Sequence, residues 1–398
     1  MIANSSLPAR NFGMQPVSKS ERILALDVMR GFALLGVLLA YTLWNLGGPP
    51  EESYSRIDIV LDAIMSALVN SKAYTLFAFL FGLGFSIQMQ RAGTRGVNIV
   101  PVYLRRLFGL LLIGLAHALL LRNGDILVPY ALMGLVLLVF RSASNKTLLV
   151  AGIIALLYPY FARSVWDLTG MPFPARPKPD GASYLAENYA WVRFWYSTAI
   201  VYWPASLPMF FFGLYMGRRR FFENIAAHRR SLRIVLITGL GVGALADAVL
   251  ILLVWKGIDS SGTLGPRLGL GLLWSIHAWG FAACYASTLL LLLETRRGKR
   301  WLAPLAAVGR MALTNYLLQA AIIVPLCLAL NLFDRVTPVL GLLLALAVWA
   351  IQVPLSMWWL KHFRFGPAEW LWRSITYGRL QSMRLAREPA ARAVTTAA

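Results

Sequence analysis

Ten apolar stretches, most of them about as long as a bilayer is thick, dominate this sequence of 398 residues. A helix needs roughly 20 residues to cross ~30 Å of hydrocarbon, and the stretches lack the polar and apolar alternation of barrel strands. We therefore predict an all-α, polytopic membrane protein with about ten transmembrane helices. The expected spans are roughly 23–46, 73–90, 105–121, 126–140, 147–164, 196–217, 231–255, 267–293, 302–330 and 337–360.

The Lys and Arg residues indicate the orientation. If the N-terminus is cytoplasmic, the inner loops hold 26 of them and the outer segments hold 10. Cytoplasmic loops are enriched in basic residues, so we predict that both termini are cytoplasmic. The net charge of +21 then reflects topology and gives no reason to expect nucleic acid as a partner.

The predicted organisation has three parts. Residues 1–22 form a cytoplasmic segment, 23–360 the transmembrane bundle, and 361–398 a cytoplasmic amphipathic segment with a basic tail. The largest outer segment, about 165–195, contains the Pro-rich run Met171–Asp180, and it either covers the outer mouth of the bundle or is a solvated connector. Residues 56–70 carry apolar residues at helical spacing among charges, which is typical of a helix lying at the membrane surface.

His117 and Asp125 are the most informative pair of titratable residues. They flank the predicted turn between the third and fourth spans, with Asp125 at the expected helix N-cap. An antiparallel hairpin brings them close together, and a carboxylate beside an imidazole orients it as a general base. Each also has a structural interpretation, as a capping residue or a hydrogen-bonded histidine.

Other polar residues fall inside or beside the spans, where they are costly unless paired or hydrated. Asp247 and His277 are expected in the outer half of the membrane, and could line one cavity with His117. The charged residues of the inner side could form one network. Asn315 and Gln319 are spaced to join helices. The inner group comprises Asp27, Arg30, Arg310, Glu369 and Arg373. We predict no metal site and no permanently bound cofactor, because four scattered histidines and two cysteines match no metal-binding pattern.

The sequence contains five distinctive motifs: LDVMRGFALLGVLLA (Leu26–Ala40), FAFLFGLGF (Phe77–Phe85), GLAHALLLRNGDILVPYALMGL (Gly114–Leu135), GRMALTNYLLQ (Gly309–Gln319) and FGPAEWLWR (Phe365–Arg373). Together they resemble the YeiB-like family of uncharacterised bacterial inner-membrane proteins, which implies a multi-pass protein of the bacterial inner membrane. Through its LDxxRG first span, the family is similar to a wider group of membrane acyltransferases that move an acyl group from a cytoplasmic donor such as acetyl-CoA to a glycan hydroxyl across the membrane.

The resemblance implies acyl transfer with acyl-CoA as co-substrate and an envelope glycan or lipid as acceptor. Some of those acyltransferases use a histidine near the outer end of the first span, where this sequence has Tyr41, Trp44 and Asn45. His117 would then be the base and Asp125 its partner. Arg105, Arg106 and Arg310 would bind the phosphates of the donor.

Two other functions remain open at this stage. A small-solute transporter or channel would use the intramembrane charges for gating or proton coupling. A non-catalytic subunit of an envelope complex would have no activity alone. The bilayer is the expected partner in every case, and the sequence is compatible with an oligomer.

Overall fold

The computed structural model describes residues 23–122, 124–177, 183–258 and 264–385. All regular elements of these residues are helical, and nine helical segments among them are long and apolar enough to cross a membrane. A shorter apolar helix, Leu127–Ser142, corresponds to the short fourth span. The prediction of an all-α polytopic membrane protein is confirmed. The expected segment 1–22 lies outside the described residues, as do 386–398 of the expected segment 361–398 and 178–182 of the outer segment.

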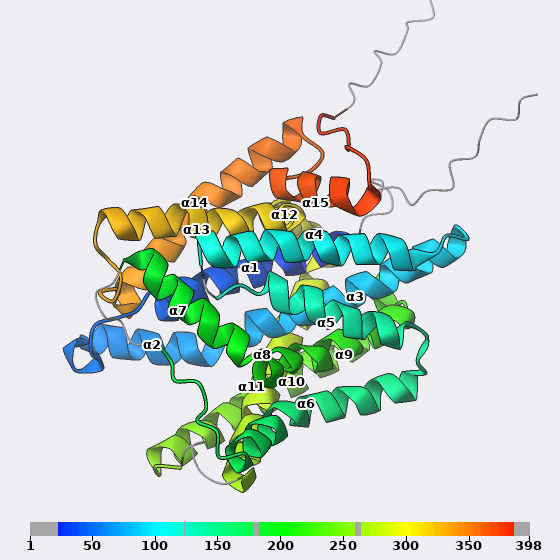
Figure 1. Ribbon diagram of the computed structural model, residues 1–398. Coiled ribbons are helices and arrows are strands. Elements are labelled where there is room, and N and C mark those ends of the chain that lie inside the picture. Colours follow the sequence, from blue (N-terminus) through cyan, green and yellow to red (C-terminus); the bar gives the residue numbers. More distant parts are fainter. Residues whose placement is uncertain (1–22, 123, 178–182, 259–263, 386–398) are drawn as a thin grey trace, which may run out of the picture.

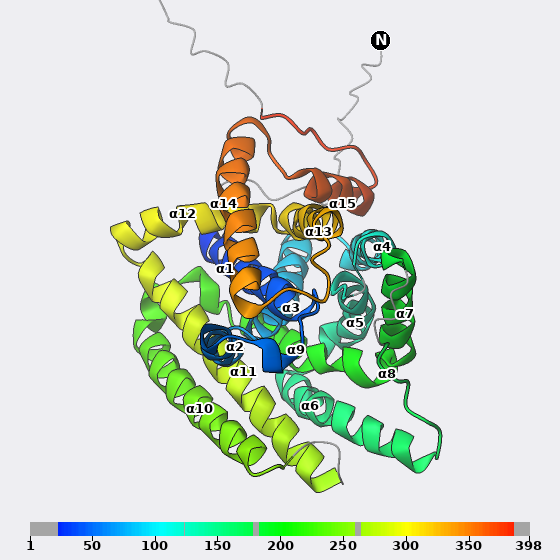
Figure 2. The same ribbon diagram turned by 90° about the vertical axis from the view of Figure 1, so that its left-hand side faces the viewer.

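The helices are numbered along the chain. Most of them are aligned with one common axis (Figure 1), so that many are seen end-on in Figure 2. We call the end of the bundle where α1 begins and α15 lies the α15 end, and the opposite end the α7 end. The α-helices are α1 Leu24–Trp44, α2 Arg56–Leu68, α3 Lys72–Thr94, α4 Ile99–Leu120, α5 Leu127–Val139, α6 Asn145–Leu168, α7 Tyr184–Ser197, α8 Ala199–Tyr202, α9 Leu207–Arg218, α10 Arg229–Trp255, α11 Leu264–Leu293, α12 Arg296–Arg310, α13 Ala312–Ala329, α14 Pro338–His362 and α15 Pro367–Tyr377.

The prediction of one continuous span over 302–330 is wrong. The helix ends at Arg310 and restarts at Ala312, so that α12 lies across the bundle while α13 runs along it (Figure 2). Four of the first five residues of α12 are basic, which favours an aqueous boundary for its beginning. The backbone of α13 at its first turn is stabilised separately, by a side chain from α15 described below.

The predicted helix over 56–70 is present as α2, Arg56–Leu68. It was expected to lie on the membrane surface, but it does not lie flat across the end of the bundle. α2 begins with a capping box between Ser55 and Asp58 and runs along the bundle towards α3 (Figure 1). The two helices are separated by a short break in which Ser71 has a left-handed backbone (φ 67°). Asp58 also accepts a hydrogen bond from the Val339 amide (3.0 Å), which ties α2 to the start of α14.

α1 crosses the centre of the bundle, and most of its side chains are buried. It contacts α12 closely because both helices carry glycine at the crossing. A Cβ on Gly31 would lie 2.0 Å from the Leu305 carbonyl oxygen, and a Cβ on Gly309 would lie 1.8 Å from that of Asp27. The backbones can approach this far only without side chains. This contact holds the charged first turns of α1 beside the end of α12.

Candidate functional site

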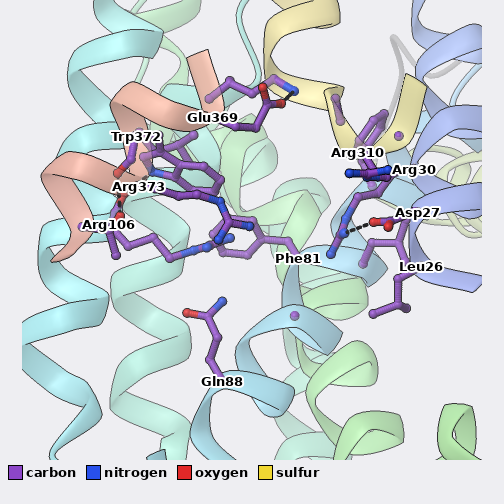
Figure 3. A pocket seen from close by; sticks show the side chains of 18 of the residues that line it. Leu26, Asp27, Arg30, Phe81, Gln88, Arg106, Arg310, Glu369, Trp372 and Arg373 are labelled. Atoms are coloured by element: carbon purple, nitrogen blue, oxygen red, sulfur yellow. Dashed lines mark hydrogen bonds and ion pairs between the residues drawn. The ribbon is translucent and has the colours of Figure 1, made fainter. Parts of the chain in front are cut away.

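A cavity of about 290 Å³ lies at the α15 end, bounded by α1, α3, α4, α5, α12, α13 and α15. It is lined by many apolar side chains together with an unusual number of charged ones, several of which converge on the cavity in Figure 3. The charged lining residues are Asp27, Arg30, Arg91, Arg106, Arg310, Glu369 and Arg373.

The structure brings together the five residues of the expected inner network. Asp27 and Arg30 form an ion pair (3.1 Å) one turn apart at the start of α1. Arg310 reaches the same cavity from the end of α12, and Glu369 and Arg373 reach it from α15 (Figure 3). Five guanidinium groups face two carboxylates here, so the cavity carries an excess of positive charge.

α15 forms one wall of this cavity. The Trp372 indole donates a hydrogen bond to the Arg106 carbonyl oxygen (2.8 Å), and the Arg106 guanidinium lies 4.0 Å from the centre of an indole ring of Trp372. Arg105, the preceding residue, is exposed on α4 and is not among the residues that line the cavity. Of the three arginines expected to bind the donor, Arg106 and Arg310 therefore share one site and Arg105 lies outside it.

Glu369 caps the first turn of α13. Its Oε1 accepts hydrogen bonds from the amides of Leu313 (2.6 Å) and Thr314 (3.2 Å), and its Oε2 accepts one from the Thr314 hydroxyl (2.5 Å). Burial raises the pKa of the Glu369 carboxyl above its ordinary value, while the bonds from Thr314 and the backbone lower it again. The carboxylate thus stabilises the helix that restarts after Arg310.

Tyr316 also lines the cavity, as do Leu127 and Tyr130 of α5. Its hydroxyl donates to Asp125 Oδ1 (3.3 Å) and accepts a hydrogen bond from the Ile126 amide (3.3 Å). Its ring also contacts His117, with 4.9 Å between ring centroids. Tyr316 therefore connects the charged cavity to the His117–Asp125 pair.

His117 and Asp125 contact each other directly, as the hairpin prediction requires. The distance from His117 Nδ1 to Asp125 Oδ1 is 3.0 Å, and the side chains are 1% and 2% exposed. Asp125 Oδ2 accepts a hydrogen bond from the Val128 amide (2.8 Å), so it caps α5 although Ile126 occupies the N-cap position. Because Nδ1 faces a carboxylate, it carries the proton, and Nε2 is left as the basic nitrogen.

Asp247 and His277 form a second, separate cluster. His277 Nε2 lies 3.3 Å from Asp247 Oδ1 and 3.2 Å from the Ala67 carbonyl oxygen, at the break between α2 and α3. Lys72, beyond the same break, donates to the Ser66 carbonyl oxygen (3.0 Å). Within the described residues, none of the three lines the charged cavity or joins His117.

Asn315 and Gln319 face α14 and join helices. Asn315 donates to the Ser356 hydroxyl (2.9 Å), and Gln319 donates to the Gln352 side-chain oxygen (3.3 Å). The Gln352 amide in turn donates to the Asn315 carbonyl oxygen (2.8 Å). All four side chains are buried, and such a satisfied polar network fixes how two helices pack.

Tyr316, Arg122 and Arg91 were not selected from the sequence. Tyr316 was visible only as one tyrosine in an apolar helix, and Arg91 as one loop cation among many. Arg122 falls within the predicted turn before Asp125, yet it is 6% exposed and its guanidinium lies 3.5 Å from the Tyr41 ring centre. In the sequence, the one indication that Arg122 belongs to the site is its position three residues before Asp125.

The fold and these features define the class of the protein, a multi-pass helical membrane protein with a basic cavity and a buried His–Asp pair. Over 92% of its length, the chain is 33% identical to the uncharacterized protein YxaH of Bacillus subtilis (strain 168), of which the match covers 96%. It is 30% identical over 89% of its length to the uncharacterized protein YeiB of Escherichia coli (strain K12), again with 96% of that protein covered. The chain belongs to the YeiB-like family.

Two family models match different parts of the chain. Residues 216–379 match a protein family of unknown function, DUF418. Residues 22–177 match the model of the catalytic domain of heparan-alpha-glucosaminide N-acetyltransferase. This second match includes α1, α4 and the turn with Asp125, and it relates the family to membrane acyltransferases.

Proposed function

We propose that this protein is an integral-membrane acyltransferase that moves an acyl group from an acyl-CoA-type donor to a hydroxyl acceptor. One observation carries the proposal: the basic cavity is lined by Tyr316, which is hydrogen-bonded to the Asp125 that contacts His117. A site for an anionic donor and a buried base are thus connected by one side chain. The similarity of residues 22–177 to an N-acetyltransferase catalytic domain supports the same activity.

The cavity suits a phosphate-bearing donor. Guanidinium groups bind phosphate through paired, charge-assisted hydrogen bonds, and five arginines line this space against two carboxylates. In our proposal the protein lies in the bacterial inner membrane with both termini cytoplasmic. The α15 end then faces the cytoplasm, where acyl-CoA is available, and the α7 end faces outwards.

The chemistry follows from the geometry of the pair. His117 Nε2 accepts the proton of the acceptor hydroxyl while its oxygen attacks the thioester carbonyl carbon. The C–S bond breaks, a C–O bond forms, and the proton passes from His117 to the thiolate. Asp125 stabilises the imidazolium that forms between these steps. A placed base of this kind contributes ~10²–10⁴-fold in rate.

The test is acyl transfer in cells. Cells that make the wild-type protein are grown with labelled acetate, and their envelope glycans and lipids are analysed for label. We expect protein-dependent labelling that His117→Ala abolishes. The matched control is His362→Ala, since His362 is exposed at the end of α14. Equal labelling with wild type and His117→Ala would refute the proposal.

A second candidate function, transport of a small solute, is favoured by the Asp247–His277 cluster. It lies beside Lys72 at an interruption between two helices, and interrupted helices commonly form ion and substrate sites in transporters. Reconstituted vesicles distinguish the two functions. A transporter moves intact solute and loses this flux in His277→Gln, whereas an acyltransferase moves no intact solute.

A further inference from the structure

A second space, an apolar groove, lies on the other side of the cavity wall. It runs between α4, α13 and α15, and its lining includes Ile113, Ala116, Leu120, Leu317 and Leu371. Among its lining residues, His117 is the one titratable group. Leu120 is 68% exposed and Leu371 is 47% exposed, so the groove is open on the outer surface of the bundle.

The groove and the charged cavity share one wall, which is formed by α4, α13 and α15. On α13, Tyr316 lines the cavity and Leu317 lines the groove. On α15, Glu369 and Trp372 line the cavity while Leu371 lines the groove. Neighbouring residues thus face opposite spaces, one basic and one apolar.

His117 is the catalytic group that this groove reaches. Its Nδ1 is engaged by Asp125, whereas its Nε2 is buried and has no hydrogen-bond partner. A buried polar atom without a partner is uncommon and is often completed by a bound molecule. The basic nitrogen of the proposed mechanism is therefore the atom left unsatisfied beside the groove.

Approach to His117 along the bundle axis is covered by α7. The Tyr184 hydroxyl donates to the Leu121 carbonyl oxygen, and the Asn188 amide donates to that of Ala118 (2.9 Å). These bonds attach α7 to the last turn of α4, directly after His117. The lateral groove stays open, and the described residues that line it are all apolar apart from His117, so they offer a sugar no other side-chain hydrogen bond.

From this arrangement we infer that the acyl acceptor is a lipid, whose hydrocarbon chain occupies the apolar groove and whose headgroup hydroxyl meets His117 Nε2. The inference rests on the proposed acyl transfer and specifies its acceptor. An apolar groove on a membrane-facing surface binds hydrocarbon and offers no partner to a hydrated sugar. The lipid hydroxyl loses its proton to His117, bonds to the acyl carbon, and displaces the donor thiolate, which takes up the proton.

The experiment uses the full-length protein in lipid nanodiscs with labelled acetyl-CoA and two acceptors that share one headgroup, octadecyl glucoside and methyl glucoside. We expect acyl transfer to octadecyl glucoside and at least tenfold less to methyl glucoside. Ala116→Trp, which fills the groove from an exposed position, should lower transfer to octadecyl glucoside at least tenfold. Leu120→Trp should have the same effect, in case Ala116→Trp does not fold. Ala244→Trp, at an exposed position of α10, is the matched control and should leave transfer unchanged.

The outcomes separate the two proposals. Equal transfer to both acceptors, or transfer to octadecyl glucoside that both groove variants leave unchanged, overturns the lipid acceptor while acyl transfer stands. Transfer to neither acceptor, together with no labelled product in extracted envelope lipids or glycans, overturns both.

Discussion

At the scale of single residues, the proposed site depends on which atom of each side chain is engaged. In the proposed mechanism His117 acts as a base through Nε2, because Asp125 engages Nδ1 and Nε2 is buried without a hydrogen-bond partner. Arg106 and Arg105 are neighbours in sequence, yet one lines the cavity and the other is exposed. Two predictions use these contrasts.

Asp125→Asn should lower acyl transfer by about 10²–10⁴-fold, with little loss of thermal stability. The asparagine oxygen can still accept from the Val128 amide, but its amide donates towards Nδ1 and leaves the proton on Nε2. Rates measured against pH report this, because raising the pH should not restore activity. Tyr316→Phe removes one hydrogen bond to Asp125 and should lower acyl transfer by a smaller factor than Asp125→Asn. An activity of Asp125→Asn within threefold of wild type would show that His117 does not need its partner.

Arg106→Gln should raise the KM for the donor about tenfold, which corresponds to about 1.4 kcal/mol. It removes a cavity cation that would pair with phosphate, and kcat should change less. Arg105→Gln is the matched control, since it removes the same charge one residue away. Steady-state kinetics over a range of acyl-CoA concentrations measures both. If the two variants behave alike, the cavity does not bind the donor.

At the scale of elements, the interrupted helix α12–α13 and the closely packed pair α1–α12 place the charges. Glu369 replaces the missing helical partners at the start of α13. Gly31 and Gly309 let α1 and α12 come close enough for Asp27, Arg30 and Arg310 to share one cavity. Each element gives a stability prediction.

Glu369→Ala should destabilise the protein by about 1–2 kcal/mol, the usual cost of a lost helix cap. Glu369→Gln keeps an oxygen that can cap and mimics the protonated acid. Because burial raises the pKa of Glu369, the wild type loses stability as pH rises from the ordinary pKa through the raised one. The Tm of Glu369→Gln relative to wild type should therefore increase over that pH range. A difference in Tm that is independent of pH would contradict a raised pKa of Glu369 in the folded protein.

Gly309→Ala should lower the Tm in detergent and displace the cavity, because its Cβ would overlap the Asp27 carbonyl oxygen. Overpacking of this kind costs about 1–3 kcal/mol. Gly241→Ala on α10 is the control, since no atom lies within 4 Å of its added Cβ. Equal stability of the two variants would mean that α1 and α12 are not in contact.

At the scale of the whole molecule, the basic cavity and the His117–Asp125 pair lie towards opposite ends of the bundle and meet at Tyr316. Acyl transfer across the membrane requires this polarity, with the α15 end on the side of the donor. The excess of basic residues in the loops that we assign to that side predicts the same orientation.

Single cysteines test the orientation in intact cells. Thr94→Cys lies exposed at the α15 end and Ala186→Cys lies exposed on α7. A membrane-impermeant maleimide should label Ala186→Cys in intact spheroplasts and Thr94→Cys only after lysis. The native Cys284 and Cys327 are buried and should contribute little label. The opposite pattern would reverse the proposed topology.

The sequence by itself determined the class of fold, because long apolar segments have few ways to satisfy their backbone in a membrane. It also determined the His117–Asp125 contact, since a short turn between two helices brings its flanks together. It did not predict the break after Arg310, which depends on a carboxylate supplied from α15. The Tyr316 connection, the burial of Arg122 and the separation of Arg105 from Arg106 also required the tertiary structure. Each depends on which helices pack together and on how each is rotated, and hydropathy carries little information about either.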